Sequence, residues 1–211
     1  MTQSFLITGP DDARVTLLMA HGAGGAMDSA AMTRAADAIG GAGLRVVRFE
    51  FGYMAERRSS GRRPPAPKAE RLISEYLAAV DALGAPPRLI IGGKSMGGRV
   101  ASMVADDLFR AGRIVGLFCL GYPFHPIGKP EQLRTAHLRH LSTPTLICQG
   151  TRDPFGTRDE VAGYGLAETI EIAWFEDGDH DLTPRKTISG FSAGDHLATM
   201  AARLAGWSNA L

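Results

Sequence analysis

The segment best suited to catalysis carries a serine flanked by two glycines. Residues 93–97 read Gly-Lys-Ser-Met-Gly, which fits G-x-S-x-G, a pattern that places a nucleophilic serine (Ser95) on a sharp turn between a strand and a helix. The same letters resemble the end of a phosphate-binding loop, G-x-x-x-x-G-K-[ST]. The first glycine of such a loop would stand at Arg88, and residues 88–91 read RLII, which is typical of a buried strand. The nucleophile pattern therefore fits better, because the glycine-rich cradle for a phosphate is missing.

A serine nucleophile needs a base, and the base needs a carboxylate that orients it. In doubly wound hydrolytic folds the acid and then the histidine follow the serine, each after a later strand. The apolar run PTLICQG (144–150) is followed by Asp153. The run IEIAWFE (170–176) is followed by His180. We therefore predict that Ser95, Asp153 and His180 form a catalytic triad at one edge of a sheet.

Other histidines compete for the role of base. His196, beside Asp195 in the last helical segment, is the second choice, because it follows no strand end. His137 and His140 lie in the polar stretch AHLRHL, and we expect both at the surface.

An oxyanion formed during attack on a carbonyl needs two backbone N–H donors. One is the residue after the nucleophile, here Met96, and the other normally lies in the loop after an early strand. That loop reads His21-Gly22-Ala23-Gly24-Gly25, so Ala23 is the second candidate donor and His21 is expected to brace the loop. The alternative is a glycine-rich turn with no catalytic role.

The opening of such a site is expected to be shallow, because the stretch between Ser95 and Asp153 is too short for a large helical lid. Its predicted substrate-binding border consists of Tyr53, Tyr122, Phe124 and His125.

Basic residues near the predicted site leave two interpretations open. The segment 55–68 holds Arg57, Arg58, Arg62 and Arg63 with several prolines, and we predict a mobile surface loop. It either attracts an anionic substrate or is simply solvated. Lys94 likewise either contacts an anionic group or points away.

Short apolar runs alternate with helical patterns along the chain. Strands are expected at 4–8, 15–22, 44–51, 88–93, 114–121, 144–150 and 170–176. Helices are expected at 28–40, 70–83, after Ser95, and at 131–141, 157–167 and 192–205. This alternation predicts an α/β fold: a doubly wound, mostly parallel sheet of about seven strands with helices on both faces and no large lid. We expect a single domain over residues 1–211.

Composition narrows the class of protein. The chain has 211 residues, 45% of them hydrophobic, and a formal net charge of +1, which argues against nucleic-acid and membrane-surface partners. Cys119 and Cys148 each lie in an apolar run without metal-ligand spacing, and the first residues do not resemble a signal peptide. We therefore expect a cytoplasmic protein with buried, reduced thiols and no bound metal.

The motifs HGAGG, GGKSMGGR, QGTRDPFG and DGDHDL together resemble the α/β-hydrolase superfamily. The chain looks most like its small, lidless bacterial branch, similar to dienelactone hydrolases, and like the family of the testis-expressed hydrolase-like protein and the hydrolase-like subunit of the NSL complex. The resemblance covers nearly the whole chain. It implies a Ser-Asp-His triad carried by Ser95, Asp153 and His180, with no cofactor. Our primary hypothesis is a serine hydrolase that cleaves a carboxylic ester or thioester of a small acyl substrate. Some relatives are scaffolding subunits, so a non-catalytic binding protein is the alternative, and the oligomeric state stays open.

Overall fold

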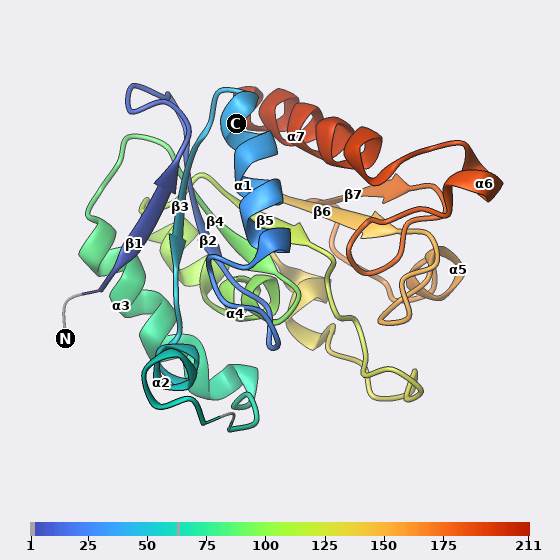
Figure 1. Ribbon diagram of the computed structural model, residues 1–211, viewed down its shortest axis with the longest axis horizontal. Helices are drawn as coiled ribbons and strands as arrows, with labels where there is room; N and C mark the ends of the chain where they lie inside the picture. Colours follow the sequence, from blue (N-terminus) through green and yellow to red (C-terminus); the bar gives the residue numbers. More distant parts are fainter. Residues whose placement is uncertain (1–2, 63) are drawn as a thin grey trace.

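A seven-stranded sheet forms the centre of the computed structural model, which describes residues 3–62 and 64–211 (Figure 1). The spatial order of the strands is β1-β3-β2-β4-β5-β6-β7. Their bounds are β1 (Phe5–Thr8), β2 (Thr16–Ala20), β3 (Arg45–Phe49), β4 (Leu89–Lys94), β5 (Gly116–Leu120), β6 (Thr145–Gly150) and β7 (Ile170–Phe175). All seven expected strands are present.

The sheet is parallel except at one edge. β1 pairs antiparallel with β3, with Phe5 opposite Phe49, and every other neighbouring pair is parallel. The central strands β2, β5 and β6 are buried along their whole length. This burial explains their continuous apolar sequences, since a strand covered on both faces has no solvent side that needs polar residues.

Helices cover both faces of the sheet, which confirms the predicted doubly wound architecture (Figure 1). On one face α1 and α7 pack together, with Met32, Ile39 and Leu204 in their shared core with β2. On the other face α3 and α4 contribute Tyr76 and Val100 to a second core. The helices are α1 (Ala30–Gly41), α2 (Gly52–Ser60), α3 (Ile73–Leu83), α4 (Met96–Arg110), α5 (Arg158–Val161), α6 (Lys186–Ser189) and α7 (Ala193–Asn209), with 3-10 turns η1 (Ala69–Leu72) and η2 (Ala136–His140). Within the described ranges, none combines the length and apolar character needed to cross a membrane.

Three segments differ from the prediction. Residues 52–60 form the helix α2, so the expected surface loop begins later, at Gly61, whose φ of 68° ends the helix. The segment 131–141 forms only a short 3-10 turn, because the backbone N–H of Arg134 bonds to the carbonyl of Phe124 instead of continuing a helix. The segment 157–167 yields only the short α5, and Gly165 soon follows it in a left-handed conformation.

Candidate active site

Ser95 occupies a strained turn between β4 and α4. Its φ of 51° and ψ of −116° lie in a region that non-glycine residues rarely adopt. The turn is tight because α4 begins directly over the ends of β4 and β2. A Cβ atom on Gly97 would lie 2.5 Å from the carbonyl oxygen of Ala20 and 2.6 Å from that of His21. The glycines of G-x-S-x-G therefore provide the space that lets the serine project from the sheet edge.

We expect Gly97→Ala to destabilise the protein by about 3 kcal/mol, because the added methyl group would overlap the backbone of β2. Gly206→Ala is the matched control: this glycine lies inside α7 with open space around it, so alanine should stabilise the helix by about 0.5–1 kcal/mol. Urea denaturation followed by circular dichroism measures both changes. A Gly97→Ala protein as stable as the wild type would contradict the close approach of α4 to β2.

The three predicted triad residues lie in hydrogen-bond contact. The Nε2 atom of His180 is 2.8 Å from the Oγ atom of Ser95, and its Nδ1 atom is 2.7 Å from Oδ2 of Asp153. The acid follows β6 and the histidine follows β7, so parallel strands bring the three side chains to one edge. Asp153 is fully buried, whereas Ser95 and His180 are half-buried.

A buried glutamine holds the carboxylate in place, and sequence reasoning missed it. Gln149 Nε2 donates to the same Oδ2 of Asp153 at 2.8 Å, and the amide of Phe155 donates to Oδ1 at 2.9 Å. The Oε1 atom of Gln149 accepts from the backbone N–H of Tyr122 at 2.7 Å. The available signal was a single amide in the otherwise apolar strand TLICQG.

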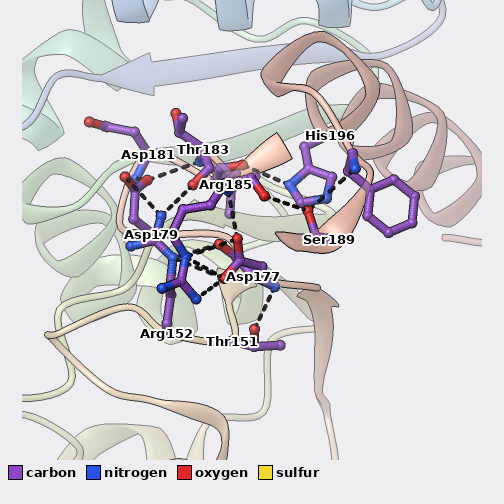
Figure 2. Close-up of polar contacts among 11 residues, drawn as sticks. Thr151, Arg152, Asp177, Asp179, Asp181, Thr183, Arg185, Ser189 and His196 are labelled. Carbon is purple, nitrogen blue, oxygen red and sulfur yellow. Dashed lines mark hydrogen bonds and ion pairs between the residues drawn. The ribbon is translucent and has the colours of Figure 1, made fainter. Parts of the chain in front are cut away.

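The loop that carries His180 is fixed by ion pairs on its outer side (Figure 2). Arg185 contacts both carboxylate oxygens of Asp177, and Nε of Arg152 donates to the Asp177 carbonyl at 2.7 Å. These arginines hold the pKa of Asp177 below its usual value, with the Arg185 hydrogen bond as the largest cause. Further along, Asp179 accepts from the backbone N–H groups of Asp181 and Thr183. These contacts restrict the movement of the loop and therefore fix the position of His180.

Lys94 joins this loop to the turn that carries Ser95. Its ammonium group donates to the carbonyl of His180 at 3.1 Å and lies 2.6 Å from Oδ1 of Asp181. The structure thus assigns Lys94 an internal anion as its partner.

The competing histidines lie elsewhere. His196 is buried, and its Nδ1 atom is 2.7 Å from the carbonyl of Leu182, so it supports the loop that carries His180 (Figure 2). His137 is half-buried instead of exposed, and its Nε2 atom is 2.8 Å from the Oγ atom of Ser102. His140 is exposed, as predicted.

Both candidate oxyanion donors line the cavity beside Ser95. Among the described residues, no acceptor bonds to the backbone N–H of Met96 or Ala23. His21 braces the loop of Ala23. Its Nδ1–H donates to the carbonyl of Gly22 at 2.7 Å, and its Nε2 atom accepts from the N–H of Phe51 at 3.1 Å. Burial lowers the pKa of His21, which favours this neutral form.

The comparison of the sequence with protein families agrees with this arrangement of Ser95, His180 and Asp153. A family described as "Alpha/beta hydrolase domain" matches residues 13–209. The chain belongs to the α/β-hydrolase family.

Solved structures extend this likeness at the level of fold. A dienelactone hydrolase from Anabaena variabilis is 21% identical, with 97% of this chain and 90% of that chain covered and a TM-score of 0.71. A serine hydrolase without a lid from Xanthomonas campestris is 18% identical, with 99% and 88% covered and a TM-score of 0.68. A serine hydrolase homologue from Coxiella burnetii is 20% identical, with 95% and 90% covered and a TM-score of 0.67. No curated protein matches the sequence.

The cavity beside Ser95 in this α/β hydrolase has a volume of about 480 Å³. This lies within the range of roughly 300–1,000 Å³ that is typical of small-ligand sites. Its apolar walls include Ala66, Pro67, Pro123 and Phe155, and the Phe155 ring lies 4.3 Å from that of His180. Between Ser95 and Asp153 the described chain adds only α4 and the turn η2 as helical elements, so no large lid covers the opening.

The four residues predicted to border the opening lie in the interior instead. Tyr53, Tyr122, Phe124 and His125 are each at most 8% exposed, and none lines the cavity. The Tyr53 hydroxyl donates to the carbonyl of Ala23 at 3.1 Å, so it supports the loop that carries Ala23. Tyr122 and Phe124 pack in the second core. His125 is also buried, and its Nδ1 atom lies 2.9 Å from the carbonyl of Pro126, so the segment after β5 turns these three side chains inward.

The arginines of 55–68 are largely engaged in local contacts. The Arg58 guanidinium binds Asp28 and Glu50, and the Arg57 guanidinium lies over the Tyr53 ring at 5.1 Å. Arg62 is exposed, and Arg63 lies outside the described residues. These contacts favour the structural interpretation of the segment over a role in attracting substrate.

Proposed function

We propose that this α/β hydrolase cleaves a carboxylic ester or thioester through an acyl-enzyme on Ser95. The observation that carries the proposal is the continuous relay from Ser95 Oγ through His180 to Asp153, with contacts of 2.8 and 2.7 Å. A serine hydroxyl is a weak nucleophile unless a base accepts its proton, and this relay supplies the base together with its orienting carboxylate.

The tautomer of His180 suits the first step. Because the Asp153 carboxylate can only accept, His180 Nδ1 carries the proton of that contact, and Nε2 is left to accept from Ser95. As Oγ attacks the carbonyl carbon, its proton moves to Nε2. The buried carboxylate then stabilises the imidazolium that forms.

The negative charge that develops on the carbonyl oxygen would be met by the N–H groups of Met96 and Ala23. Met96 is the first residue of α4, so the positive end of the helix dipole adds to this stabilisation.

The acyl-enzyme then forms and is hydrolysed. His180 returns its proton to the leaving alcohol or thiol as the bond to the carbonyl carbon breaks, and Ser95 retains the acyl group. Water then gives a proton to His180 and attacks the ester carbon. The acid leaves, and the proton returns to Ser95.

Intact-protein mass after exposure to a fluorophosphonate tests the activated serine. We expect one adduct on the wild type and none on Ser95→Ala or His180→Ala, because the reaction needs both the nucleophile and its base. Hydrolysis of p-nitrophenyl esters of increasing chain length tests turnover. No adduct on folded wild type, together with no ester cleavage, would overturn the proposal in favour of a binding or scaffold protein on a hydrolase fold.

We also infer a reducing compartment such as the cytoplasm. Cys119 and Cys148 are buried, neither forms a disulfide, and burial raises the pKa of both thiols. They therefore act as small apolar core residues.

A further inference from the structure

The cavity beside Ser95 carries an excess of positive charge. Its charged lining consists of Lys68, Arg99 and Arg134 against the single acid Glu70. Lys68 and Glu70 are exposed at its rim, whereas both arginines are half-buried. Charge in a partly desolvated wall interacts more strongly with a ligand than charge on an open surface.

Arg99 lies one helical turn beyond the nucleophile. Its backbone N–H donates to the carbonyl of Ser95 at 3.0 Å, and four residues of α4 correspond to a rise of about 6 Å. The guanidinium contacts Glu70 at 2.5 Å. Its Nε atom is buried and has no hydrogen-bond partner among the described residues.

Arg134 is the half-buried cation of the cavity that has no ion-pair partner among the described residues, whereas Lys68 is exposed to solvent. Two hydrogen bonds fix the backbone of Arg134. Its N–H donates to the carbonyl of Phe124 at 2.7 Å, and its carbonyl accepts from the Tyr122 hydroxyl at 3.0 Å. The guanidinium itself makes no hydrogen bond or ion pair with any residue in the described ranges. Burial, followed by the like charge of Arg99, lowers the pKa of Arg134. An anion in the cavity would relieve both effects.

We propose that the substrate of this site carries a carboxylate that Arg134 binds, with Arg99 beside it, while its ester or thioester carbonyl lies at Ser95. This inference rests on the proposed function and adds the substrate class. A carboxylate fits the planar fork of a guanidinium. A single negative charge also suffices for the half-buried part of the wall, because Glu70 already offsets Arg99 there and Arg134 is the partly desolvated cation that remains, while Lys68 is exposed to solvent.

The remaining walls define the part of the substrate between the two groups. Ala66, Pro67, Pro123 and Phe155 offer apolar surface without a hydrogen-bonding side chain. A short aliphatic or aromatic spacer therefore fits between the carbonyl at Ser95 and the carboxylate at Arg134.

Matched pairs of esters test the proposal. One pair is the phenyl half-ester of adipic acid and its isosteric primary amide. The second pair is the acetate esters of 4-hydroxyphenylacetic acid and 4-hydroxyphenylacetamide, which carry the charge on the leaving group. We expect wild type to prefer the acid in at least one pair by about tenfold or more in kcat/KM, the size of a charge-assisted contact. Arg134→Gln should bring that ratio close to one, and Arg134→Lys should retain part of it.

The ratio of kcat/KM for the acid to kcat/KM for the amide is taken within each variant, so a general loss of activity cancels. Arg110→Gln is the charge-matched control, because Arg110 lies at the end of α4 with an exposed side chain and pairs with Asp107. It should keep the wild-type ratio. Turnover of acids and amides at equal rates in both pairs, or an unchanged ratio in Arg134→Gln, would overturn the inference alone. Absence of any turnover, with no fluorophosphonate adduct on wild type, would instead refute the proposed function.

Discussion

Replacing Ser95 with alanine is expected to lower kcat for ester hydrolysis by about 10⁵- to 10⁶-fold. The hydroxyl is the only group in hydrogen-bond contact with His180 Nε2 among the described residues, so its loss removes the nucleophile and leaves the base without a proton to accept. The fold should be retained, because Ser95 lines a cavity and its side chain fills no core space. Initial rates with p-nitrophenyl esters, measured beside the thermal unfolding temperature, check this result.

The chain provides a closely matched control. Ser102 lies on the same helix, and its Oγ atom is also 2.8 Å from a histidine, His137. That pair lacks a hydrogen-bonded carboxylate among the described residues and borders no part of the Ser95 cavity. We expect Ser102→Ala to leave kcat unchanged. Ester hydrolysis that persists in Ser95→Ala but disappears in Ser102→Ala would refute the assignment of the nucleophile.

Asp153→Asn is expected to lower kcat by about 10⁴-fold. Both oxygens of this carboxylate accept: Oδ1 from the N–H of Phe155, and Oδ2 from Gln149 and His180. An asparagine must direct its NH₂ group at one of these donors. If it faces His180, the ring must adopt the tautomer with its proton on Nε2, which can no longer accept from Ser95.

The size of the loss is tested by steady-state kinetics and by the rate of fluorophosphonate labelling. Asp159→Asn, an exposed acid in α5, controls for the change in charge and should leave both rates unchanged. Because the triad acts as a unit, adding Asp153→Asn to Ser95→Ala should lower kcat no further. Wild-type kcat in Asp153→Asn, with normal unfolding, would show that the carboxylate has no role in the reaction.

The sequence by itself determined the fold class and the three residues that the structure brings into hydrogen-bond contact. Ser95, Asp153 and His180 each come within a few residues of the end of a strand that is visible as an apolar run, and parallel strands bring their carboxyl ends to one edge. The glycines around Ser95 also signalled the turn. These signals are local, since they depend on periodicity and on spacing within a few residues.

Only the tertiary structure decided which side chains surround the relay. Lys94 contacts the carbonyl of His180 across 86 positions, and Gln149 holds Tyr122 across 27. The aromatic residues predicted at the opening turned inward, while Arg99 and Arg134 came to share a wall of the cavity. Such contacts depend on strand order, on the tilt of each helix and on the direction of each side chain. No pattern within one segment encodes these quantities, because they arise when distant segments pack into a common core.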